Sequence, residues 1–94
     1  MKIQWLDDAI EDLQSLRYYI AKDNTSAANE VVKKILHSIE LLEKHPEIGR
    51  FGRVLNTREL VISGLPYIVP YQVRNNVVEI LRVLHCAIEW TENF

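Results

Sequence analysis

Residues 58–84 read RELVISGLPYIVPYQVRNNVVEILRVL, and this stretch decides the fold. β-Branched and aromatic residues dominate it, and such residues favour extended chain. Gly64-Leu65-Pro66 and Asn75-Asn76 divide the stretch into three runs, 58–63, 67–74 and 77–84. An Asn-Asn pair tolerates positive φ and therefore suits a two-residue hairpin loop. The stretch predicts a three-stranded antiparallel meander.

The predicted hairpin has two faces of different polarity. With Asn75-Asn76 as its loop, Arg74 pairs with Val77 and each later pair follows by counting. The face expected to pack on helices carries Val73, Val78, Tyr71, Ile80, Val69, Arg82, Tyr67 and Leu84. The other face has an apolar patch, which consists of Ile68, Pro70, Leu81 and Val83, with His85 just beyond. Because a sheet that is apolar on both faces needs cover on both, we expect one of two arrangements. Either the patch is a docking groove for a partner, or the loop at 46–57 and the C-terminal tail cover it.

Two amphipathic helices are predicted upstream of the meander. Apolar residues recur at spacings of three and four through residues 6–20 and again through residues 28–42. The polar residues 23–26 separate the two patterns, and the Lys-His-Pro sequence at 44–46 ends the second. Helices joined by so short a connection pack as an antiparallel hairpin. Residues 2–5 alternate polar and apolar, as in a short strand. The expected α+β fold is therefore an N-terminal strand, an antiparallel helical hairpin and a three-stranded antiparallel meander packed on the helices.

The composition excludes several classes of protein. Ninety-four residues leave room for a single domain, which we expect to span residues 1–94. No apolar run approaches the roughly 18 residues of a membrane span, and Asp7 and Asp8 interrupt the N-terminus before a signal-peptide core can form. The single cysteine, Cys86, excludes an internal disulfide and fits a reducing cytoplasm. The three histidines share no ligand-type spacing with one another or with Cys86, so we expect no metal and no cofactor.

The charge of the chain is distributed unevenly. The formal net charge is −2 and the sequence pI is about 5.9, which argues against a general clamp for nucleic acid. Residues 49–58, however, hold Arg50, Arg53 and Arg58 without a single acid. An anionic ligand would meet the chain at this stretch. The alternative is that the three arginines are solvated side chains on a loop.

Residues 42–90 carry short motifs in a fixed order. They are Pro46 with Gly49-Arg50 and Gly52-Arg53, then Arg58-Glu59-Leu60, Tyr67-Ile68-Val69-Pro70-Tyr71, and Val83-Leu84-His85 with Trp90. Each motif is short, but their order and spacing resemble the RelE/ParE superfamily of bacterial type II toxins. The resemblance covers nearly the whole chain and is closest to the ParE branch. It implies a growth-inhibiting toxin of the kind that stabilises plasmids.

The superfamily uses its fold in two ways, so the resemblance leaves two activities open. RelE-type members are ribonucleases that cleave messenger RNA in the ribosomal A site, whereas ParE-type members poison DNA gyrase. In the first case the resemblance implies Arg58 as the residue that stabilises the phosphate. Arg82 would assist, and His85 would be the general acid, because imidazole is the side chain best suited to proton transfer near neutral pH.

Three departures argue against the ribonuclease. RelE-like enzymes carry lysines near the loop and a late tyrosine, but no lysine follows Lys44 here and no tyrosine follows Tyr71. Ribosome-entering members are also strongly basic, as repeated phosphate contact requires, and this chain is acidic. Arg58 and Arg82 can equally be strand residues paired with neighbouring acids, and His85 can be a structural histidine at a strand end.

We therefore expect a ParE-like inhibitor of DNA gyrase that a cognate antitoxin neutralises. The residues expected to bind antitoxin or target are Arg50, Arg53, Arg58, Ile68, Pro70, Leu81, Val83, His85, Trp90 and Phe94. The antitoxin would fold onto the groove and would make the only contact with DNA, and no membrane would be involved. The RelE-like alternative acts on the ribosome and its messenger RNA. A third possibility is an inactive remnant that retains antitoxin binding alone.

Overall fold

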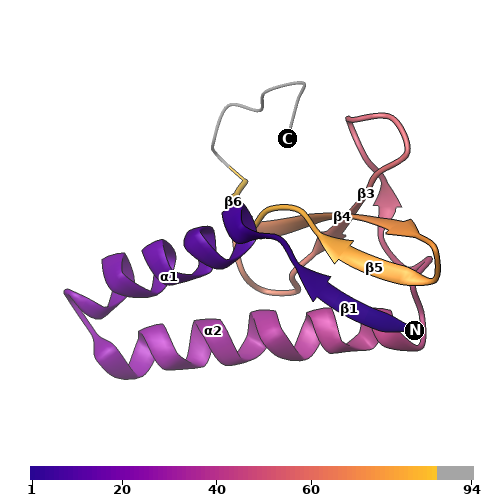
Figure 1. The fold of residues 1–94 in the computed structure, drawn as a ribbon. Helices are drawn as coiled ribbons and strands as arrows, with labels where there is room; N and C mark the ends of the chain where they lie inside the picture. The colour runs from indigo at the N-terminus through magenta and orange to yellow at the C-terminus, as the bar shows by residue number, and fades with distance from the viewer. Residues whose placement is uncertain (87–94) are drawn as a thin grey trace.

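The computed structural model describes residues 1–86, whose elements follow the expected order (Figure 1). Strand β1 (Lys2–Trp5) leads into the helices α1 (Asp7–Ala21) and α2 (Thr25–Glu40), and a short 3₁₀ helix, η1 (Leu41–Glu43), extends α2. The remaining strands are β2 (Arg50–Phe51), β3 (Arg58–Val61), β4 (Tyr67–Arg74), β5 (Val77–Ile80) and β6 (Leu84–His85). The α+β class is therefore as predicted.

The two helices form the predicted antiparallel hairpin, and α2 runs along the lower side of the sheet in Figure 1. The Asn24 side chain caps α2 by accepting a hydrogen bond from the Ala27 backbone N at 3.0 Å, which satisfies one of the unpaired donors of the first turn. In α1, Asp7 and Asp8 occupy the first turn, where negative charge complements the helix dipole. Within residues 1–86, no helix has both the length and the apolar character that a membrane crossing needs.

The sheet is larger than the predicted meander. Its strands lie in the order β1-β5-β4-β3-β2, with β6 paired to β4. β1 pairs with β5 in parallel, and the other described pairs are antiparallel. Residues 46–57 are consequently not all irregular, because Arg50 and Phe51 form an edge strand against Glu59 and Arg58.

The hairpin register is confirmed near the turn and wrong beyond it. Arg74 pairs with Val77, and the pairing continues by simple counting as far as Tyr71 with Ile80. Asn75 and Asn76 both have positive φ, at 52° and 61°, as the turn requires. At the next position the backbone N–H groups of Leu81 and Arg82 both donate to the Pro70 carbonyl, at 2.9 and 3.4 Å. Two residues thus oppose one, which is a β-bulge.

This bulge changes which side chains share a face. Ile68 now pairs with Leu84 and Tyr67 with His85, one residue later than predicted. Because cross-strand partners lie on the same face of a sheet, His85 and Tyr67 are on the same face. Val83, expected in the apolar patch, belongs instead to the main hydrophobic core.

The core fills the space between the helices and one face of the sheet. Its members come from both helices, η1, the strands and the segments between strands. They are Ala9, Ile35, Ile39, Leu42, Leu60, Ile62, Val69, Tyr71, Val78, Ile80 and Val83. The apolar stripes of the two helices therefore pack as their spacing predicts.

Candidate functional site

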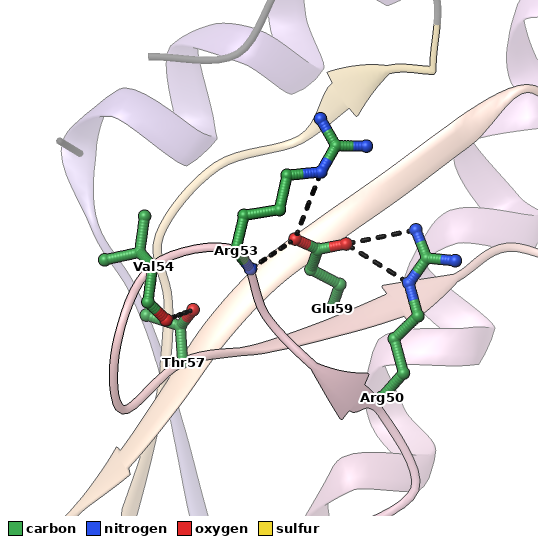
Figure 2. Close-up of polar contacts among 5 residues, drawn as sticks. All are labelled: Arg50, Arg53, Val54, Thr57 and Glu59. Carbon is green, nitrogen blue, oxygen red and sulfur yellow. Dashed lines mark hydrogen bonds and ion pairs between the residues drawn. The ribbon is translucent and has the colours of Figure 1, made fainter. Parts of the chain in front are cut away.

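A buried carboxylate organises the arginine-rich loop (Figure 2). The Glu59 side chain is 3% exposed and accepts hydrogen bonds from Arg50 Nε and Nη2 at 3.2 and 3.1 Å, both on Oε1. Its Oε2 accepts from the Arg53 backbone N at 3.0 Å and lies 3.9 Å from Arg53 Nε. Burying a charge is costly unless it is paired and hydrogen-bonded, so these contacts allow Glu59 to be buried. Arg50 and Arg53 are not simply solvated loop residues.

Hydrogen bonds within the loop between β2 and β3 also hold its shape. The Gly52 backbone N donates to the Thr57 carbonyl at 2.8 Å. Thr57 Oγ1 donates to the Val54 carbonyl at 2.6 Å (Figure 2). Asn56 adopts a left-handed conformation with φ of 64°, which asparagine tolerates better than most residues. A Cβ at position 52 would collide with the Thr57 hydroxyl, so this turn requires glycine.

Tyr71 and Arg58 hold the connection between η1 and β2. The Tyr71 hydroxyl donates to the Pro46 carbonyl at 2.7 Å and accepts from the Gly49 backbone N at 2.9 Å. Arg58 Nη1 donates to the carbonyls of Glu47 and Gly49, at 3.1 and 2.8 Å. Burial raises the pKa of the Tyr71 hydroxyl, and its hydrogen bond to Gly49 partly opposes that rise. Arg58, a predicted catalytic cation, thus anchors the backbone.

Arg82, the second predicted cation, joins the sheet to α1. Its Nε and Nη2 donate to Asp12 Oδ2 and Oδ1 at 2.7 and 2.9 Å, a bidentate pair. Asp12 Oδ2 also accepts from the Val83 backbone N at 3.0 Å. The hydrogen bond to Asp12 raises the pKa of the Arg82 guanidinium, so it stays charged. The pair fixes the bulged segment between β5 and β6 to α1.

His85 lies at the edge of a pocket between α1 and β6. Its ring meets the Tyr67 ring edge-on, with centroids 5.4 Å apart. The pocket has a volume of about 540 Å³, and its lining includes apolar side chains such as Leu16 and Ile20 as well as the polar groups of Asp12, Ser15, Tyr19, Arg82 and His85. Burial raises the pKa of the Tyr67 hydroxyl. Arg82 and His85 therefore share a pocket, while Arg58 lines a separate hollow beside Phe51 and Leu55.

The apolar patch, for which the sequence left open either a docking groove or a covered face, is buried in the structure. Ile68, Leu81 and Val83 are 2%, 7% and 4% exposed, and Pro70 is fully buried. The bulge at Pro70 moves Val83 into the core, and the other three side chains are inaccessible in this conformation. Trp90 and Phe94 lie outside the described residues. Among residues 1–86 there is no cluster of three or more side chains suited to hold a metal ion.

Sequence reasoning missed several residues that shape these sites. Glu59 stood in a recognised motif, yet only the folded loop reveals that its carboxylate is buried. Asp12 looked like an ordinary polar residue of α1, because its partner is 70 residues away in sequence. Phe51 and Leu55 were not singled out from the sequence, although two large apolar residues in a polar segment were a usable signal.

Comparison with known proteins places the chain among toxins. Residues 3–90 match the family of ParE toxins of type II toxin-antitoxin systems, parDE. A putative toxin, Y4kP, from Sinorhizobium fredii is 40% identical over 91 residues, covering 97% of this chain and 94% of that protein. Toxin RelE2 from Caulobacter vibrioides is 31% identical over 86 residues, covering 92% and 96%.

The fold agrees with a solved structure of the same kind. A chain from the chromosomal ParDE toxin-antitoxin system of P. aeruginosa superimposes with a TM-score of 0.82 at 24% identity, covering 90% of this chain and 95% of that one. At this identity the likeness concerns the fold. Together with the match over residues 3–90, it leads to one conclusion: the chain belongs to the ParE toxin family of type II toxin-antitoxin systems.

Proposed function

We propose that this toxin acts by binding DNA gyrase, with a cognate antitoxin as its neutralising partner. The proposal needs a stable docking surface and no matched acid and base. The β2–β3 loop, braced by Glu59, and the pocket between α1 and β6 offer such surfaces. Gyrase acts on chromosomal DNA, so the site of action would be the cytoplasm.

The observation that carries the proposal is the engagement of both predicted catalytic cations in internal contacts. Arg82 is held by a bidentate pair with Asp12, and Arg58 donates to two backbone carbonyls. Stabilising the phosphate of a scissile RNA bond would require at least one of these cations to face the substrate. The net charge of −2 also disfavours repeated phosphate contact.

The antitoxin surface that fits best is the pocket between α1 and β6. It combines apolar side chains with the Asp12–Arg82 pair and His85, so that an extended or helical segment could bury apolar groups and find polar partners. Of the residues predicted to bind antitoxin or target, Arg50, Arg53, Arg58 and His85 are accessible in part. Ile68, Pro70 and Leu81 could take part only after a local rearrangement.

The second candidate function is ribosome-dependent RNA cleavage, which the shared pocket of Arg82 and His85 favours. The two functions separate in a pair of assays on the same purified chain. One measures supercoiling by gyrase, and the other measures messenger RNA cleavage on translating ribosomes, each with and without antitoxin. We expect antitoxin-reversible loss of supercoiling and intact messenger RNA. Messenger RNA cleavage with normal supercoiling would overturn the proposal, and inactivity in both assays would indicate a remnant.

A further inference from the structure

We propose that one tip of the toxin, formed by Phe51 at the end of β2 and by the β2–β3 loop (residues 52–57), inserts into its protein target, with Phe51 and Leu55 as the anchors. The inference rests on the proposed function, since it assigns the contact with gyrase to one surface. It adds two residues and a kind of partner surface: an apolar depression on a folded protein with acidic groups around it.

The first reason is the exposure of the two side chains. Phe51 is 84% exposed and Leu55 is 85% exposed, while Tyr19, the next most exposed large apolar side chain among the described residues, reaches 74%. Leu55 lies in the β2–β3 loop, which projects from the end of the sheet (Figure 1), and Phe51 comes directly before this loop as the last residue of β2. Single apolar side chains scattered over a surface are normal. Two of them together at a projecting tip instead indicate an interaction site.

The second reason is that the tip is built to hold its shape. Arg58 Cζ lies 4.7 Å from the centre of the Phe51 ring, and Arg58 is itself fixed by the backbone carbonyls of Glu47 and Gly49. Glu59 fixes the opposite side of the loop through the backbone of Arg53. A loop that is already ordered loses less conformational entropy when it binds.

The third reason is charge. The Arg50 and Arg53 side chains are 56% and 53% exposed beside the tip, and Glu59, an acid that both of them contact, is buried. The surface presented at the tip is therefore apolar in the middle and cationic around it. Its complement is an apolar depression with an acidic rim.

The shape favours a folded protein over a flexible segment or RNA. A flexible segment gains most contact by lying in a groove of the toxin, whereas a projecting tip is buried only when it enters a concave surface. RNA is the other anionic partner, but Leu55 offers no flat ring for a base to stack on, and residues 45–94 contain no lysine.

The test compares the binding of full-length variants to purified gyrase by surface plasmon resonance. The variant Phe51→Ala/Leu55→Ala should bind at least about tenfold more weakly, because interface anchors dominate binding energy. The matched control is Leu41→Ala/Val61→Ala, which removes two half-exposed apolar side chains elsewhere and should bind like the wild type. Phe51→Trp, which keeps an aromatic anchor, should also retain binding. Thermal unfolding midpoints establish that each variant is folded.

The outcomes separate this inference from the proposed function. If the wild type and the Phe51→Ala/Leu55→Ala variant bind gyrase equally, the loop is not the anchor and the inference is wrong, while gyrase remains the target. If the wild type does not bind gyrase at all, the proposed function fails and the inference fails with it. If the wild type binds ribosomes and the Phe51→Ala/Leu55→Ala variant does not, the partner belongs to another class of macromolecule and the inference is wrong.

Discussion

At the scale of single residues, Glu59 shows how a charge can stabilise a loop from inside. Replacing it by alanine removes three hydrogen bonds and takes away the anion that Arg50 and Arg53 share. We expect Glu59→Ala to lower the free energy of unfolding by about 1–3 kcal/mol, less than for a fully buried pair because both arginines are half exposed. Urea denaturation measures the change. The control is Glu30→Ala, which removes an exposed carboxylate. If both variants change the free energy of unfolding equally, Glu59 does not stabilise the loop.

Tyr71 supplies a second prediction at this scale. Tyr71→Phe leaves the Pro46 carbonyl and the Gly49 N–H without their partner, so the free energy of unfolding should fall by about 1–3 kcal/mol. The control Tyr19→Phe, on the surface, should leave the free energy of unfolding almost unchanged. Burial raises the pKa of Tyr71 above the ordinary value of 10.0. Its contribution to stability is therefore complete below about pH 10 and is lost as the pH rises through the raised value. The phenylalanine variant should show a shallower alkaline decline, and identical pH profiles would contradict this account.

At the scale of elements, the Asp12–Arg82 pair links α1 to the bulged segment between β5 and β6. A double-mutant cycle with Asp12→Ala and Arg82→Ala should give a coupling energy of about 1–3 kcal/mol, because the pair is bidentate and largely shielded from solvent. The matched control is the pair of Arg74 and Glu79, whose N–O distance is 3.2 Å but whose arginine is 67% exposed. That pair should couple by less than about 1 kcal/mol. Equal coupling energies would mean that the Asp12–Arg82 pair is an ordinary surface contact.

The elements also show what the sequence could and could not predict. Apolar spacing was sufficient for both helices, and Asn75-Asn76 was sufficient for the hairpin register near the turn. The predicted register is wrong beyond Pro70, where the structure has a bulge. The proline was a usable signal, because it lacks the N–H that a central strand needs and is tolerated at a bulge. Counting pairs through that residue placed Val83 and His85 on the wrong faces.

For the candidate site, residue types were easier to predict than their partners. Arg50, Arg53 and Arg58 were recognised as a cluster, but their engagement with Glu59 and with backbone carbonyls depends on the folded loop. No local pattern marks such contacts. The segment that carries the arginines is held by internal hydrogen bonds and projects from the sheet. The patch around Ile68, for which a docking groove was one expectation, is buried.

At the scale of the whole molecule, we propose a toxin that works by docking. Its acidic chain and its internally engaged cations suit contact with a protein better than chemistry on RNA. The most direct measurement is the accumulation of covalent gyrase–DNA complexes as the full-length chain is titrated into purified gyrase and plasmid DNA. The account predicts that these complexes accumulate with toxin concentration and disappear when equimolar antitoxin is added. Undiminished supercoiling without covalent complexes, at several-fold molar excess of toxin, would contradict it.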